Sequence, residues 1–203
     1  MSARRALRLV LLACVVASAP LAASVEPEAA AVVEKLHGEL IAVMKKADAL
    51  GYAGREARLR DPLLASYDLD FMARLVLGRH WQTLSEAQQA QFVEAFTRLT
   101  LANYAGQFTG FAGEQFEVVG EEPGVQDTVL VKTRLVRPSE EPVQLDYRLH
   151  RTPAGWRIID VYLNGTISEL ALRRSEYSAL LRREGFDALM QALDAKIAEL
   201  GRG

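Results

Sequence analysis

The fold is decided by residues 127–163, DTVLVKTRLVRPSEEPVQLDYRLHRTPAGWRIIDVYL, which contain three successive β-rich runs. In the first two runs apolar and polar residues alternate, and this period of two is typical of a strand with one buried face. The apolar positions of the middle run are Val143, Leu145, Tyr147 and Leu149. Because the connections between the runs are short and rich in turn formers, the three strands are predicted to pair as antiparallel neighbours.

Segments with helical periodicity flank these strands. The spacing of apolar residues predicts helices over 27–50, 68–77 and 85–104, and a further strand over 115–121. Two more helices are predicted after Gly165, separated at Gly185. The sequence therefore predicts an α+β fold with an antiparallel sheet of about four strands, covered by several helices.

Individual residues predict where these helices begin and end. Gly51 and Gly54 are expected to end the first helix, and Pro62 is expected to open a link that runs through Ser66. Asp68 is expected to cap the second helix. Ser85 with Gln88 three residues later forms a capping-box pattern at the start of the third.

The N-terminal segment is predicted to be a signal peptide over residues 1–23, followed by a single domain over 24–203. Three arginines precede an apolar run, and small residues then offer cleavage points. The apolar run is too short to span a membrane. Since the only cysteine, Cys14, lies in this segment, the mature chain is expected to contain no disulfide and no thiolate metal site.

Charge and motifs argue against several classes of protein. The net charge of −2 is not typical of nucleic-acid binding. His37 is predicted on the polar side of the first helix, His80 after a helix end, and His150 on the outer face of a strand, a spacing that favours no metal site. The chain has no Gly-x-Ser-x-Gly elbow, no phosphate-binding loop and no His-Glu-x-x-His motif. Were the chain an enzyme, Asp160 or Asp146 would be its candidate acid or base.

An ordered set of motifs extends over nearly all of the mature chain. The set comprises YDLDFMARLVLGRHW at 67–81, residues 88–96, Tyr104, GWRIIDV at 155–161 and NGTIS at 164–168. This set resembles the MlaC family, periplasmic phospholipid-binding proteins also described as toluene-tolerance auxiliary components of an ABC transporter. The segments 108–116, 170–177 and 183–187 are more similar to hopanoid-associated members. At 164–168 the family more often has an acidic residue before the glycine and a valine before the serine.

The resemblance implies a periplasmic carrier that holds lipid tails in an apolar cavity between helices and a curved sheet. The cargo would be a phospholipid or a hopanoid-like lipid. It would be exchanged with an inner-membrane ABC transporter complex and an outer-membrane lipid-transfer complex, which links the chain to outer-membrane lipid asymmetry. No catalysis and no cofactor other than the cargo are implied, and a monomer is expected. The residues expected to line the cavity are Phe71, Met72, Leu75, Val76, Phe92, Phe96, Leu99, Val131, Leu145, Tyr147 and Leu149.

Periodicity alone leaves alternatives open. The same apolar residues fit a solid core equally well, because a cavity wall and a packed interior have the same pattern. A small α+β enzyme on an apolar substrate and a periplasmic adaptor that docks an apolar helix surface on a protein partner are the alternative functions. Arg173 and Arg174 fit either a contact with a headgroup or partner, or a solvated helix face, and the solvated face is the favoured interpretation.

Overall fold

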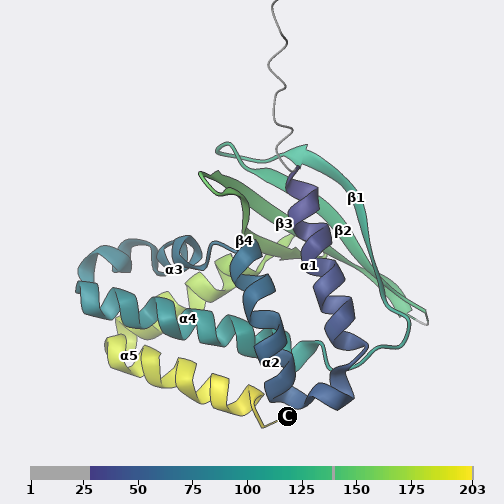
Figure 1. Cartoon of the computed structure of the whole chain (residues 1–203). Coiled ribbons are helices and arrows are strands. Elements are labelled where there is room, and N and C mark those ends of the chain that lie inside the picture. The colour runs from purple at the N-terminus through teal and green to yellow at the C-terminus, as the bar shows by residue number, and fades with distance from the viewer. Residues whose placement is uncertain (1–27, 139, 203) are drawn as a thin grey trace, which may run out of the picture.

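The computed structural model describes residues 28–138 and 140–202, so the predicted signal peptide lies outside the described residues. Helices and a five-stranded sheet make up this part of the chain (Figure 1). The elements, in order, are α1 (Ala29–Met44), α2 (Ala47–Ser66), α3 (Leu69–Leu77), the 3₁₀ helix η1 (Gly78–Thr83), α4 (Glu86–Gln107), β1 (Gln115–Pro123), β2 (Val129–Arg137), β3 (Glu140–Thr152), β4 (Gly155–Leu163), β5 (Ile167–Ser168) and α5 (Glu169–Leu200).

The sheet has the strand order β1-β2-β3-β4-β5, and every pair is antiparallel. This confirms the predicted α+β class and the antiparallel pairing of the strands in 127–163. The fifth strand is the two-residue β5, which pairs with the end of β4. Tyr147 lies opposite Val131 on one side and Val161 on the other, so these three side chains share one face of the sheet.

The sheet is curved and does not close into a barrel. It arches over the helices, with α1 packed across it and α2, α3 and α5 meeting β4 (Figure 1). An antiparallel sheet of this kind buries one face and needs helices to cover it. The interior of the protein therefore lies between this face and the helical layer.

Local signals at the helix ends are confirmed. The Asp68 carboxylate accepts a hydrogen bond from the backbone N–H of Phe71 at 3.0 Å and caps α3. Ser85 and Gln88 form both bonds of the capping box at the start of α4. Gly185 has a φ of 85° and separates the two halves of α5, as predicted, and the second half returns alongside α4 (Figure 1). Such a φ favours glycine over any residue with a Cβ atom.

The first helical segment differs from the prediction. Helix α1 ends at Met44, and α2 continues through Pro62 to Ser66, where a link was expected. Gly51 has a φ of 59° and a non-helical backbone that interrupts α2, so the break expected at Gly51 is confirmed, whereas Gly54 lies inside the helix. The prediction of a link from Pro62 to Ser66 was wrong because this part of α2 is held by tertiary packing against α1 and α4, which outweighs the local preference of proline. Its buried positions are Ala47, Arg55, Leu59, Leu63 and Ser66.

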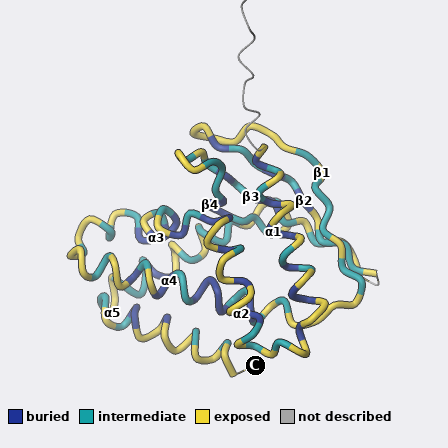
Figure 2. The backbone as a smooth tube through the Cα atoms, viewed as in Figure 1, coloured by how far each residue is buried: buried dark blue, intermediate teal, exposed yellow. Residues whose placement is uncertain are grey.

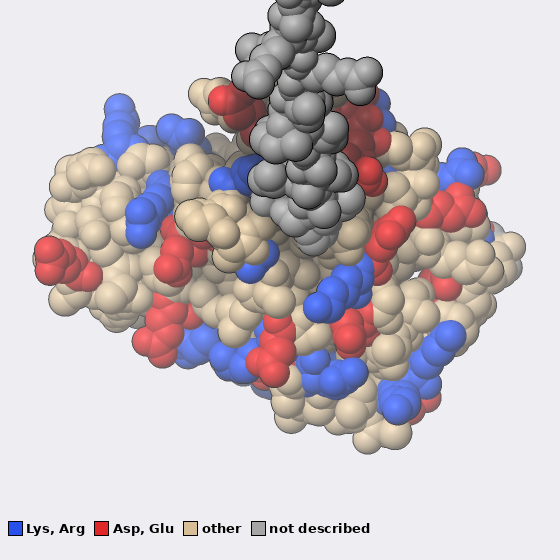
Figure 3. Space-filling model, turned by 45° about the horizontal axis from the view of Figure 1, so that its top comes forward, with Lys and Arg blue, Asp and Glu red and all other residues tan. Residues whose placement is uncertain are grey.

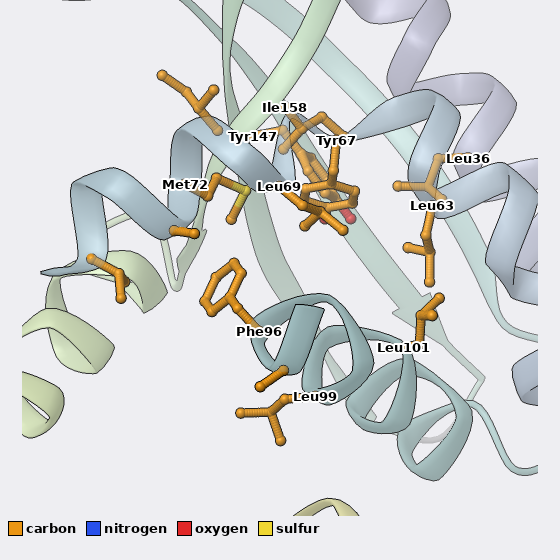
Figure 4. Close-up of a cluster of buried hydrophobic side chains, with 14 of the residues drawn as sticks. Leu36, Leu63, Tyr67, Leu69, Met72, Phe96, Leu99, Leu101, Tyr147 and Ile158 are labelled. Carbon is orange, nitrogen blue, oxygen red and sulfur yellow. The ribbon is translucent and has the colours of Figure 1, made fainter. Parts of the chain in front are cut away.

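The core lies where the helices face one another and the sheet. Buried positions follow the inner sides of α1 to α4, whereas the connection between β1 and β2 is exposed (Figure 2). Phe96 points from α4 toward Met72 of α3, and Tyr67 lies beside Leu69 close to Tyr147 of the sheet (Figure 4). These contacts join the helical layer to the sheet at one end of the molecule.

Two histidines do not lie where the pattern placed them. His37 is only 5% exposed and stacks on Phe116 with ring centroids 4.0 Å apart, so its predicted position on a polar helix side is wrong. His150 is partly buried rather than on an outer face. Its Nε2 lies 2.9 Å from the Asp68 carboxylate, and its ring packs on Phe71. The prediction was wrong because Asp68 and Phe71, at the start of α3, cover the ring, a tertiary contact that strand alternation does not reveal.

Candidate functional site

A pocket of about 170 Å³ lies between the helices and strands β3 and β4; we call it the sheet pocket. Its walls combine aliphatic and aromatic side chains with a few polar groups, as in small-molecule sites. The lining residues are Tyr67, Met72, Phe96, Thr100, Asn103, Tyr104, Gln107, Phe108, Leu145, Tyr147, Asp160, Val161, Leu163, Glu169, Leu170 and Arg173. They come from α3, α4, β3, β4 and the first two turns of α5, with Tyr67 just before α3 and Phe108 just after α4, so the site exists only when both layers are assembled.

Three tyrosines bring hydroxyl groups to this wall without leaving them unpaired. The Tyr67 and Tyr104 hydroxyls bond to each other, and the Tyr147 hydroxyl lies 3.1 Å from His37 Nε2. Burial raises the pKa of Tyr104 to about 12 and raises the pKa of Tyr67 and Tyr147 well above the ordinary value. These hydroxyls therefore stay protonated at neutral pH, and paired hydroxyls make a wall compatible with an apolar ligand.

Asp160 fastens α5 to the sheet beside the pocket. Its carboxylate accepts hydrogen bonds from the backbone N–H of Val161 at 2.8 Å and of Leu170 at 3.1 Å, and from the Ser168 hydroxyl at 2.6 Å. Ser168 in turn caps α5. These bonds give Asp160 a structural role at the start of α5.

Asp146 is likewise occupied within the sheet. It is 1% exposed although the alternating pattern placed it among polar positions. Its carboxylate accepts hydrogen bonds from the Thr133 backbone N–H at 3.2 Å and from the Gln144 side chain at 2.8 Å. Neither of the two carboxylates proposed for an enzyme is thus free to serve a substrate without breaking these bonds.

A second hollow of about 390 Å³ lies between α4 and the two halves of α5; we call it the α5 groove. Its floor is aliphatic and its rim carries charges of both signs. The lining residues are Leu99, Asn103, Glu169, Leu172, Arg173, Glu176, Tyr177, Leu180, Leu189, Ala192, Leu193 and Lys196. Asn103, Glu169 and Arg173 line both hollows, so the sheet pocket and the α5 groove meet at these three side chains.

The predicted wall residues fall into separate places. Those that line the sheet pocket are Met72, Phe96, Leu145 and Tyr147. Leu99 lines the α5 groove. Fully buried in the core are Val76, Phe92, Val131 and Leu149. Phe71 packs on His150, and Leu75 is half-buried on α3. A role of these residues in binding a lipid stays a prediction.

Sequence reasoning did not assign the polar side of the pocket. Along α4 the lining positions are Thr100, Asn103, Tyr104 and Gln107, which follow the helical repeat but not an apolar stripe. A search for apolar stripes therefore passes over Thr100, Asn103 and Gln107, whereas Tyr104 belongs to the helix predicted over 85–104 and to the family motif set. The sequence signal available for these residues was their spacing of three and four positions, which places them on one face of the helix.

The sheet pocket is small for a lipid. Pockets that hold drug-sized ligands measure about 300–1,000 Å³, and this pocket measures about 170 Å³. An acyl chain would thus require the helices and the sheet to move apart, or the pocket to join the α5 groove. The deep apolar cavity that the resemblance implies stays a prediction.

Other kinds of site find no support in the described part of the chain. Within residues 28–138 and 140–202, no three His, Cys, Asp or Glu side chains are arranged to hold a metal ion. No helix in these ranges has the length and apolar character needed to cross a membrane. On the face seen in Figure 3, basic and acidic side chains are interspersed.

Comparisons with known proteins agree with this architecture. A family model described as MlaC protein matches residues 34–195. The chain belongs to the MlaC family. This MlaC-family protein is 20% identical over 145 residues to the intermembrane phospholipid transport system binding protein MlaC of Haemophilus influenzae, covering 70% of this chain and 67% of the relative.

A solved structure shares the fold. The phospholipid-binding protein from Ralstonia solanacearum, solved in complex with a phospholipid, matches with a TM-score of 0.76 at 23% identity. The match covers 86% of the MlaC-family chain described here and 99% of the Ralstonia chain. The names of both relatives describe binding proteins, and neither names a reaction.

Proposed function

We propose that this MlaC-family protein is a periplasmic phospholipid carrier whose sheet pocket receives an acyl chain of the lipid. The observation that carries the proposal is the aromatic and aliphatic lining where the helices meet β3 and β4. A shared fold with a protein solved with bound phospholipid supports it. The carrier binds its lipid without covalent chemistry and works as a monomer.

The energetics are sufficient for carriage. Burying about ten methylene groups gains roughly 8 kcal/mol, at about 0.8 kcal/mol for each group. A net free energy of that size corresponds to a dissociation constant near 1 μM. Separating the helices from the sheet uses part of this gain, which leaves an affinity that permits release to a partner.

The partners follow from the transport role. The Haemophilus relative is named for an intermembrane phospholipid transport system. The proposal is that this chain exchanges lipid with an ABC-type complex in the inner membrane and a lipid-transfer complex in the outer membrane. A hopanoid-like lipid is the alternative cargo, suggested by the resemblance of residues 108–116 to hopanoid-associated members. Family membership favours carriage over an enzyme or an adaptor.

Transfer of a fluorescent phospholipid between donor and acceptor vesicles tests the proposal. Leu145→Glu places a carboxylate on the pocket wall, where a charge facing an acyl chain is strongly unfavourable, and should slow transfer at least tenfold. Val119→Glu is the matched control, because Val119 is a strand residue that is 63% exposed and lies outside the pocket. Circular dichroism verifies that both variants fold.

The possible results distinguish an error in the proposed function from an error in the proposed lipid site. If the wild-type protein transfers no phospholipid, the proposed function is wrong. If the wild type transfers lipid and folded Leu145→Glu transfers it equally fast, then the cargo lies elsewhere and the sheet pocket is not its site.

A further inference from the structure

The sheet pocket and the α5 groove adjoin at three shared side chains. Asn103, Glu169 and Arg173 line both, whereas the remaining lining residues belong to one hollow or the other. The pocket extends toward β3 and β4, and the groove extends between α4 and the returning half of α5. Both hollows are lined largely by apolar side chains, and we call the place where they adjoin the branch.

Arg173 is the cation at the branch. Lysine and arginine are otherwise absent from the lining of the sheet pocket, and in the described residues Arg173 takes part in no ion pair. Its guanidinium lies beside the Tyr177 hydroxyl. Burial raises the pKa of Tyr177, and the neighbouring Arg173 charge opposes that rise. The half-buried charge is thus turned toward the hollows and lacks a carboxylate partner.

The other charged groups near the branch are accounted for. Glu169 lies in the first turn of α5, where a negative charge interacts favourably with the helix N-terminus. The Asp160 carboxylate accepts three hydrogen bonds within the protein. Lys196 on the groove rim pairs with Glu199 at 3.0 Å. Glu176 lies on the groove rim one turn after Arg173. Arg173 therefore remains the cation available to an anionic ligand.

We infer that Arg173 binds the phosphate of a two-tailed lipid whose tails separate into the sheet pocket and the α5 groove. An arginine matches a phosphate because its planar guanidinium can donate two parallel hydrogen bonds. Asn103 of α4 lines both hollows at the same point, and its side-chain nitrogen donates to the Leu99 carbonyl at 2.9 Å. This inference rests on the proposed function and adds to it the chemical class of the headgroup and the place of the second tail.

The phosphate contact is tested with two lipids that share their tails, dioleoyl phosphatidic acid and dioleoylglycerol, presented as cyclodextrin complexes so that no other phospholipid competes for the site. The wild type should bind the phosphatidic acid at least tenfold more tightly, because a hydrogen bond to a charged group contributes more than a neutral one. Arg173→Gln should lose this preference. Arg173→Lys, which keeps the charge, should retain most of it.

Arg182→Gln is the matched control, since Arg182 is exposed on the same helix and lines neither hollow. It should bind both lipids as the wild type does. A folded Arg173→Gln protein with the wild-type preference overturns the inference. Should that variant not fold, the wild type decides, and equal affinity for the two lipids overturns it. A wild type that binds neither lipid refutes the proposed function itself.

The assignment of the second tail to the α5 groove is tested by filling the groove with a large side chain. Ala192→Trp places a large side chain in the α5 groove, while Gln191→Trp adds the same bulk at the neighbouring exposed position, which does not line it. The Ala192 variant should weaken binding of dioleoyl phosphatidic acid about tenfold and leave single-chain lysophosphatidic acid within about twofold. Equal binding of the two-tailed lipid by both tryptophan variants contradicts the assignment of the groove to a second tail.

Discussion

Protonation of His37 is expected to weaken the contact between α1 and the sheet. The ring is enclosed by Phe116 and Tyr147, and its Nε2 faces the Tyr147 hydroxyl that backs the sheet pocket. Burial lowers the pKa of His37 from 6.5 to about 4. The folded protein thus strongly favours the neutral imidazole, because the charged form would lose its hydration.

The sign and size of the effect follow from this pKa. In the unfolded chain His37 gains its proton near pH 6.5, and in the folded chain only near pH 4. Between these values the unfolded state binds more protons, so the free energy of unfolding falls as the pH is lowered through this window. At about 1.4 kcal/mol for each pH unit, the loss by pH 4 amounts to roughly 3 kcal/mol.

Urea unfolding at pH 7 and pH 4 measures this term in the wild type and in His37→Gln. Glutamine does not titrate and can still reach the Tyr147 hydroxyl, whereas the titrating carboxylates are the same in both proteins. The wild type should lose roughly 3 kcal/mol more than the variant between the two pH values. An equal loss in both proteins would refute the account of His37 as a buried neutral base.

Two further predictions concern the helix boundaries. Asp68→Ala removes the cap of α3 and the partner of His150, and should lower the free energy of unfolding by about 1–2 kcal/mol in a urea titration; an unchanged midpoint contradicts the capping role. Gly185→Ala forces on alanine a φ of 85° with an extended ψ, a conformation found essentially only for glycine, and should cost about 1–3 kcal/mol. Its control Gly38→Ala, at an open and exposed position inside α1, should stabilise by up to about 1 kcal/mol. If Gly185→Ala is as stable as Gly38→Ala, the bend in α5 does not need its glycine.

Features encoded by neighbouring residues could be predicted from the sequence. The strands in 127–163 follow from alternation and short turns, and the capping box at Ser85 follows from two residues three positions apart. The continuation of α2 through Pro62 could not, because it depends on packing against α1 and α4. The buried position of His37 likewise depends on Tyr147, a partner 110 residues away.

The candidate site was predictable only in part for the same reason. Met72 and Phe96 were identified as apolar members of helices, and both line the sheet pocket. Equally apolar residues such as Phe92 lie in the solid core, and no local pattern separates the two groups. Arg173 and Arg174 are adjacent arginines, yet Arg173 lies at the branch of the two hollows and Arg174 packs against Gly78. The fold alone makes that distinction.

Native mass spectrometry of the protein, purified without detergent, tests the central claim most directly. The account predicts a population whose mass exceeds that of the polypeptide by one phospholipid, and loss of that adduct in Leu145→Glu but not in Val119→Glu. A wild-type protein that carries no lipid, and that takes up none from phospholipid vesicles, would contradict the account.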